Sequence, residues 1–174
     1  SGTANKNLGG LPGSTLIGVG GAEKVIVDCG GLGRFAQLDN NGLLTAGVTM
    51  AGLTIQNCSA GAIRYIGNGL GQPDRDLVLV GMRFVGNTQG SHGGAMTITG
   101  PNNVLRAALT SFENNQVEGY RGGAIAISDG ATLKMGWSRL TGNQSLWGIA
   151  GTGNAGGAIS VTGADTTVEV NHSY

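Results

Sequence analysis

The sequence contains a four-residue motif that recurs at similar intervals along the chain. Gly-Gly-Ala-Met occupies positions 93–96, and Gly-Gly-Ala-Ile occupies positions 122–125 and 156–159. A degenerate copy, Ala-Gly-Ala-Ile, lies at 60–63, so the last glycines of the four copies are separated by 33, 29 and 34 residues. Self-similarity with a period of about 20–50 residues is typical of solenoids, propellers and arrays. We therefore expect similar units that bury their apolar faces against one another.

A second set of positions keeps a more regular period. Asn87, Asn115 and Asn143 follow one another at intervals of 28 residues, and Asp28 and Asn57 extend the series toward the N-terminus. A large apolar residue precedes each of the three central asparagines by three positions. An asparagine amide both donates and accepts hydrogen bonds and tolerates a left-handed backbone. We expect these five residues to stack as a side-chain ladder within a turn.

The spacing of apolar residues within each repeat indicates strands rather than helices. Apolar residues alternate with polar or small ones in 105–109 and 133–137, and a second alternating segment follows each tetrad. Such alternation is typical of half-buried strands, and it places Leu109 and Trp137 on the inward face. Two or three short strands per repeat predict one turn of a parallel β-helix, with equivalent residues about 4.8 Å apart in neighbouring coils.

These patterns predict an all-β fold, a right-handed single-stranded parallel β-helix of about six coils of roughly 28–34 residues. Residues 1–14 would be an N-terminal extension or linker, and residues 15–174 would form the solenoid. The chain stops one residue short of the next apolar position of the repeat, so we expect a fragment of a longer repeat protein. The paired glycines are expected to turn a corner with positive φ, or to leave space where two chain segments meet.

Composition supports this interpretation and limits the classes of partner. Glycine accounts for 35 of 174 residues and aromatic residues for 5%, which suits a narrow interior of small stacked side chains. The formal net charge is zero and 11% of the residues are charged, so the chain has no basic stripe suited to nucleic acid or an anionic membrane. It also has no run of about 18 apolar residues, so we expect no direct membrane insertion.

The combination of Gly-Gly-Ala-[Ile/Leu/Val] with Phe-x-x-Asn resembles the repeat of the polymorphic outer-membrane proteins. These are β-helix adhesins, and similar repeats occur in large extracellular proteins of algae and protists. The pairs Phe84/Asn87 and Phe112/Asn115, with the three tetrads, carry the resemblance over roughly residues 15–174. Leucine replaces phenylalanine in the next repeat, and the first two repeats depart further. The resemblance implies a non-catalytic scaffold or adhesin segment, extracellular or at the cell surface.

Three classes of function follow, in order of preference. The first is that scaffold or adhesin, which would contact partners through the loops 88–92, 116–121 and 144–155, because their lengths differ between repeats. Its partners would be other segments of the same longer chain, surface proteins or glycans, or further copies in a self-assembly. The second is a structural spacer in a filament or appendage. The third is a carbohydrate-active enzyme of the pectin lyase-like kind.

Catalysis by a β-helix enzyme of that kind requires clustered carboxylates, which either bind Ca²⁺ or act as acid and base. The ten acidic residues are spread along the chain, and few of them share a position of the repeat. We therefore expect no enzyme activity, no catalytic residue, no metal site and no cofactor.

The two cysteines, Cys29 and Cys58, are 29 residues apart, and each directly follows a position assigned to the ladder. In adjacent coils they would lie about 4.8 Å apart, within the usual range of Cα separations for disulfides. An oxidising compartment would link them, whereas free thiols would be small core residues. We favour the disulfide.

Asparagine glycosylation has three candidate acceptors in the sequence. Asn57, Asn143 and Asn171 each begin an Asn-x-Ser sequon. The first two belong to the expected ladder, where a buried amide could not carry a glycan. Asn171 alternates with Val170 and His172 and is expected to point outward, so it is the preferred glycosylation site in a secreting eukaryote.

Overall fold

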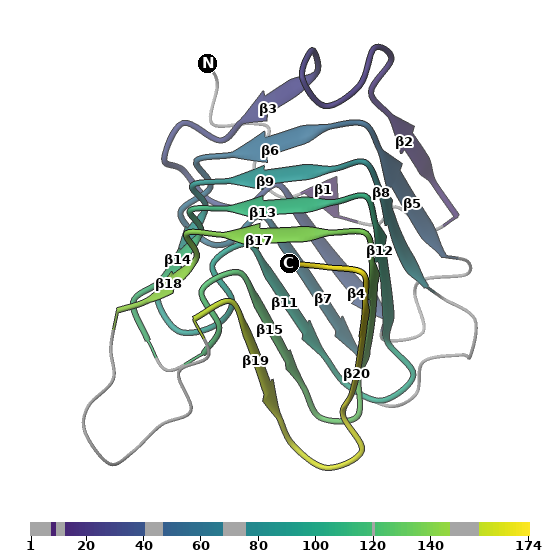
Figure 1. Ribbon diagram of the computed structural model, residues 1–174, viewed down its shortest axis with the longest axis vertical. Coiled ribbons are helices and arrows are strands. Elements are labelled where there is room, and N and C mark those ends of the chain that lie inside the picture. The colour runs from purple at the N-terminus through teal and green to yellow at the C-terminus, as the bar shows by residue number, and fades with distance from the viewer. Residues whose placement is uncertain (1–7, 10–12, 41–46, 68–75, 120, 147–156) are drawn as a thin grey trace.

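The computed structural model is an all-β parallel solenoid, and it describes residues 8–9, 13–40, 47–67, 76–119, 121–146 and 157–174. Strands of successive coils lie above one another and run parallel, so each face of the solenoid is a parallel sheet (Figure 1). The predicted parallel β-helix class is confirmed. Two of the sheets have six strands, but complete turns number about four, slightly fewer than the six coils expected.

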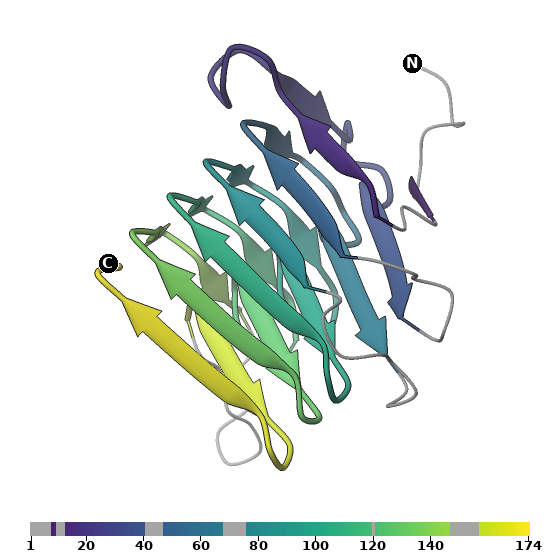
Figure 2. The ribbon, with the colours of Figure 1, turned by 90° about the vertical axis from the view of Figure 1, so that its right-hand side faces the viewer.

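In the part of the chain that the structure describes, four sheets line the faces of the solenoid. Sheet A contains β1 (Leu8–Gly9), β4 (Ala36–Asn40), β7 (Ile63–Gly67), β11 (Met96–Thr99), β15 (Ile125–Ser128) and β19 (Ile159–Thr162). Sheet B, which faces the viewer in Figure 2, contains β2 (Thr15–Ile17), β5 (Val48–Ala51), β8 (Leu77–Val80), β12 (Val104–Ala108), β16 (Thr132–Gly136) and β20 (Thr167–Asn171). Sheet C contains β3 (Ile26–Asp28), β6 (Thr54–Gln56), β9 (Arg83–Val85), β13 (Ser111–Glu113) and β17 (Arg139–Thr141). Sheet D contains the short strands β10 (Thr88–Gln89), β14 (Gln116–Val117) and β18 (Gln144–Ser145).

The core consists of inward side chains that stack on equivalent residues of the next coil. In sheet B, Leu105 pairs with Leu77 on one side and with Leu133 on the other, and all three are buried. In sheet C the buried rings of Phe84 and Phe112 stack with centroids 5.0 Å apart and an interplanar angle of 9°. Such an aromatic pair contributes about 0.5–1.5 kcal/mol beyond the burial of its area.

A column of left-handed residues turns the chain between sheets B and C. Gly52 and Gly81 occupy it first, with φ of 65° and 58°, followed by Leu109, Trp137 and His172, with φ of 52°, 52° and 50°. A residue with positive φ interrupts the alternation of a strand, so its side chain leaves the inward face. Leu109 and Trp137 are each 65% exposed, so their predicted inward placement was wrong. The Trp137 ring instead stacks on His172 with centroids 4.4 Å apart.

The paired glycines of the central tetrads lie where the chain meets neighbouring backbone. None of Gly93, Gly94, Gly122 and Gly123 has a positive φ. A Cβ atom on Gly94 would lie 2.2 Å from the carbonyl oxygen of Gly123, and one on Gly93 would lie 2.0 Å from that of Met96. These glycines therefore leave space for close chain contact, which was the second of the two expected roles.

The solenoid begins earlier in the chain than the predicted boundary. Strand β1 lies within residues 1–14, and Leu8 pairs with Ala36 of β4. Within the described residues, no helix has the length and apolar character needed to cross a membrane.

Candidate functional site

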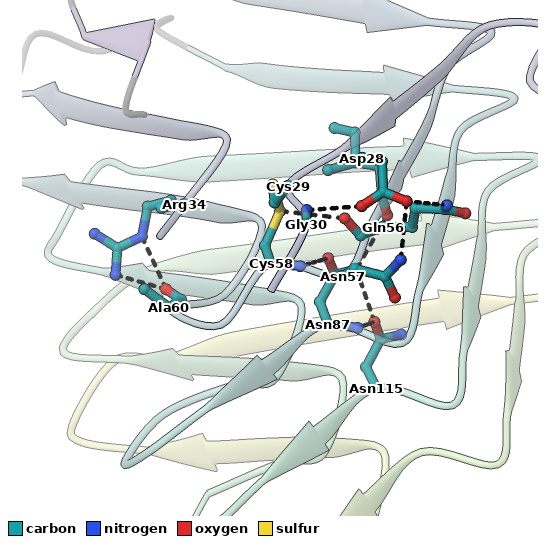
Figure 3. Close-up of a disulfide and its surroundings, with 11 residues drawn as sticks. Asp28, Cys29, Gly30, Arg34, Gln56, Asn57, Cys58, Ala60, Asn87 and Asn115 are labelled. Atoms are coloured by element: carbon teal, nitrogen blue, oxygen red, sulfur yellow. Dashed lines mark hydrogen bonds between the residues drawn. A yellow bond between two sulfur atoms is a disulfide. The ribbon is translucent and has the colours of Figure 1, made fainter. Parts of the chain in front are cut away.

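The first two coils are joined by a disulfide between Cys29 and Cys58. Their Cα atoms are 4.8 Å apart, and the predicted disulfide is confirmed (Figure 3). It joins the loop that follows β3 to the loop that follows β6, so it fixes one end of the solenoid to the stack. Disulfides persist in oxidising compartments.

The asparagine ladder runs through Asn87, Asn115 and Asn143 at the start of sheet D. The Asn115 amide oxygen accepts hydrogen bonds from the backbone N–H and the side-chain amide of Asn87, both at 3.0 Å. The Asn143 oxygen accepts the same pair of bonds from Asn115, at 3.0 and 2.9 Å. Asn87 and Asn115 are fully buried. At the end of the ladder, the backbone N–H of Cys58 donates to the Asn87 side chain (Figure 3).

Asp28 and Asn57 lie outside this ladder. Strand pairing sets Ile55 beside Phe84, so Cys58, not Asn57, is level with Asn87. Asn57 is exposed in a left-handed turn with φ of 55°, and its amide donates to the Asp28 carboxylate at 3.0 Å. The Asp28 pKa is lowered because Gln56, the Gly30 N–H and Asn57 all donate to its carboxylate.

The three sequon asparagines therefore have different surroundings. Asn57 is exposed, so the burial expected for it was wrong. Asn143 is half-buried, and its amide donates to the Phe112 carbonyl at 2.8 Å. Asn171 is exposed at the end of β20, in the outward position expected for it.

A polar pocket of about 360 Å³ lies on the outer face of sheet A. Its floor comes from outward residues of three neighbouring strands: Arg64 of β7, Thr97 and Thr99 of β11, and Ser128 of β15. These residues alternate with inward core residues of the same strands. The turn after β15 adds Asp129, whose carboxylate accepts hydrogen bonds from Thr99 at 2.8 Å and Ser128 at 2.9 Å.

The walls of the pocket come from two of the loops that vary in length between repeats. The first of these segments supplies Gln89 of β10 and, after that strand, Ser91 and His92. The segment after β14 supplies Arg121. Gln89 accepts a hydrogen bond from Thr97 at 3.2 Å, which ties the first loop to the floor. Ser91 Oγ lies 2.7 Å from His92 Nδ1.

Among the described residues that line the pocket, two are permanent cations and one is a carboxylate. Arg64 and Arg121 are half-buried, and neither forms a salt bridge with any residue that the structure describes. Burial lowers the pKa of His92, and the positive charges of Arg121, Arg64 and Arg34 lower it further. The pKa of Asp129 is also lowered, first by its two hydroxyl donors and then by Arg121. At neutral pH the pocket therefore holds a neutral imidazole and an ionised carboxylate.

By contrast, Arg83, Arg106 and Lys134 on the outer surface are paired with carboxylates. The salt bridges of the described residues join Arg83 to Glu23 and Glu113, Arg106 to Asp76, and Lys134 to Glu169. Nowhere in the described ranges do three or more histidine, cysteine, aspartate or glutamate side chains gather as a metal site would require.

The loops that form the walls of this pocket were among those predicted to contact partners, but its floor was not predicted from the sequence. The loops 88–92 and 116–121 were expected to contact partners, and both contribute residues. Loop 144–155 lies largely outside the described residues. The missed signal was the residue directly after each tetrad, which faces outward and includes Arg64 and Thr97. Comparison with protein-family models, curated proteins and solved structures finds no match to this chain.

Proposed function

We propose that this chain is a non-catalytic scaffold segment of an extracellular or cell-surface protein, which recognises a partner through the loops on sheet A. The pocket on that sheet is the observation that carries this proposal. Its walls belong to loops of variable length, whereas its floor belongs to the stacked strands. Binding residues are often found on loops that a rigid scaffold positions. The motif resemblance to β-helix adhesins agrees with such a role.

The disulfide and the surface asparagine support an extracellular location. Disulfides are rare in reducing compartments and common in secreted and surface proteins. The Cys29–Cys58 bridge links adjacent coils. Asn57 and Asn171 are both exposed within sequons. Because the Asn57 amide donates to the Asp28 carboxylate, Asn171 is the site we propose for a glycan.

The chemistry of the pocket supports recognition rather than glycoside cleavage. Hydrolysis of a glycosidic bond normally uses two carboxyl groups, one of which must be protonated. Asp129 is the one carboxylate among the described residues that line the pocket, and its lowered pKa keeps it ionised. A lone ionised carboxylate can accept hydrogen bonds from a ligand, but it is a poor proton donor.

The spacer function remains as an alternative because apolar side chains are exposed at the terminal coils. Ile17 and Ile26 are 61% and 55% exposed at one end, and Val170 and Tyr174 are 45% and 80% exposed at the other. A further coil, from this chain or another copy, would bury such residues. Light scattering across a concentration series tests this alternative, which predicts growth into longer assemblies.

A panel of immobilised glycans and matrix proteins tests the proposed recognition. The loop variant Gln89→Ala/Ser91→Ala/Arg121→Ala should lose the binding that the unmodified chain shows. A control variant on sheet B, Arg106→Ala/Lys134→Ala, should retain it. Equal binding by both variants would show that the loops do not recognise the partner. Mass spectrometry of the glycans after incubation with the protein tests the absence of catalysis, because any cleavage product would contradict a non-catalytic role.

A further inference from the structure

The charges of the sheet A pocket are separated along the strands. Arg64 and its neighbour Thr97 lie at the second position of their strands, and Ala126 of β15 is level with them. Asp129 follows Ala126 by three residues, so its backbone lies about 10 Å further along the strand direction. Two further lining residues also lie on the side of the strand starts: His92 precedes β11, and Arg121 precedes β15. The backbones of the two arginines thus lie near the strand starts, the cationic end of the pocket, and that of Asp129 lies beyond the strand ends, the acidic end. The Arg121 charge still acts on Asp129 and lowers the pKa of its carboxyl group.

The remaining lining residues provide hydrogen-bonding groups. Thr97, Thr99 and Ser128 carry hydroxyls, and Gln89 carries an amide. Within the described lining, no aliphatic side chain or hydrocarbon ring offers an apolar surface. An apolar peptide side chain would find little to pack against. A compact ligand with several hydroxyls would match the donors and acceptors that are present.

The two arginines select the charge of the ligand. Both Arg64 and Arg121 are half-buried and lie outside the salt bridges of the described residues. A guanidinium binds carboxylate, sulfate or phosphate oxygens through charge-assisted hydrogen bonds, which are about twice as strong as neutral ones. Asp129 would repel an anion placed beside it, but it would accept hydrogen bonds from sugar hydroxyls.

We propose that the sheet A pocket binds an acidic saccharide, with its anionic group between Arg64 and Arg121 and its hydroxyls directed toward Asp129 and Thr99. This inference rests on the proposed recognition function, and it adds the chemical class of the ligand. The ligand class combines the charge expected at one end of the pocket with the hydroxyls expected at the other. A carboxylated and a sulfated sugar share this chemistry, so both belong in the test.

Calorimetric titration with three matched probes tests the ligand class. The probes are methyl β-D-galactopyranosiduronate, its neutral twin methyl β-D-galactopyranoside, and the 6-sulfate of that neutral sugar. At least one acidic probe should bind about tenfold or more tightly than the neutral twin. The tighter of the two acids identifies the anionic group. Inorganic sulfate is the fourth probe, and it should bind more weakly than the acidic sugars because it lacks hydroxyls for the acidic end.

Single substitutions then test the residues. Arg64→Gln and Arg121→Gln should each weaken binding of the acidic probe about tenfold or more. Arg106→Gln removes the same charge from the outer face of sheet B and should leave the affinity unchanged. Circular dichroism checks that each variant is folded. For the unmodified chain, added NaCl should weaken binding of the acidic probe and not of the neutral one, a readout that needs no variant.

Two results would overturn the ligand class without touching the proposed function. One is equal affinity for the acidic and neutral probes, and the other is no binding of either acid while the loop-dependent binding to the immobilised panel persists. If neither Arg64→Gln nor Arg121→Gln changes the affinity for the acidic probe, the anionic group does not bind between these two arginines. Loss of loop dependence in the panel itself would instead refute the proposed function.

Discussion

Replacement of Asn115 by alanine should strongly destabilise the solenoid. The buried amide makes two hydrogen bonds with Asn87, one with Asn143 and one with the Phe84 carbonyl, all between 2.9 and 3.0 Å. Alanine would leave the Asn87 backbone N–H buried without this acceptor, at about 1–3 kcal/mol, and would remove three bonds worth about 0.5–1.5 kcal/mol each. Because these bonds share partners, we expect a total loss of about 2–5 kcal/mol. That corresponds to a melting temperature roughly 5–20 °C lower for a chain of this size.

Urea denaturation followed by circular dichroism, with the disulfide intact, measures this loss. Asn114→Gly is the matched control, because Asn114 is exposed with φ of 53° and glycine adopts that conformation readily. Asn143→Ala should have an intermediate effect, since Asn143 is half-buried. If Asn115→Ala unfolds at the same urea concentration as Asn114→Gly, the ladder does not stabilise the fold.

Three further changes test the pocket, the disulfide and the tetrads. An NMR titration should show a His92 pKa below the ordinary value of 6.5, and Arg121→Gln should raise that pKa. If the substitution leaves the His92 pKa unchanged, the charge of Arg121 does not contribute to lowering it. Because the folded state disfavours the proton, this group should lower stability as the pH falls from above 6.5 through the lowered pKa. Reduction of the disulfide should cost about 2–4 kcal/mol in urea titrations, and no change would show that it is dispensable. Gly94→Ala should lower the melting temperature, because its Cβ would lie 2.2 Å from a backbone oxygen, whereas Gly90→Ala has open space and should be nearly neutral.

The fold was predictable because register in a solenoid follows directly from the period of the sequence. Positions 28 residues apart, such as Leu77 and Leu105, are strand partners in the structure. The prediction failed by one residue where the period changes. Asn57 was aligned with Asn87, which would set Thr54 beside Phe84, but Ile55 pairs with Phe84. A one-residue slip exchanges the faces of a strand, so burial of an isoleucine decided the register and moved Asn57 into the turn.

The corners were less predictable because strand alternation carries no information about where a strand ends. Leu109 and Trp137 continue the apolar pattern of β12 and β16, and their sequence position alone favours an inward side chain. Glycines occupy the same corner column in earlier coils, at Gly52 and Gly81, and all four residues have positive φ. A column that contains glycine in two coils is therefore a signal for a turn in the other coils, even where the residue is large and apolar.

The repeat pattern of the sequence predicts the core but not the pocket, because only inward residues must match between coils. Inward residues stack at about 4.8 Å on their equivalents, so neighbouring coils must carry side chains that fit one another. Outward residues lack this constraint, and the outward column after the tetrads changes from Arg64 to Thr97, Ala126 and Ser160. The period of the sequence therefore identifies the scaffold but does not identify binding residues. In a solenoid of this kind, a recognition site should be sought first in outward columns whose residue type changes from coil to coil. Columns beside loops of changing length are the best candidates.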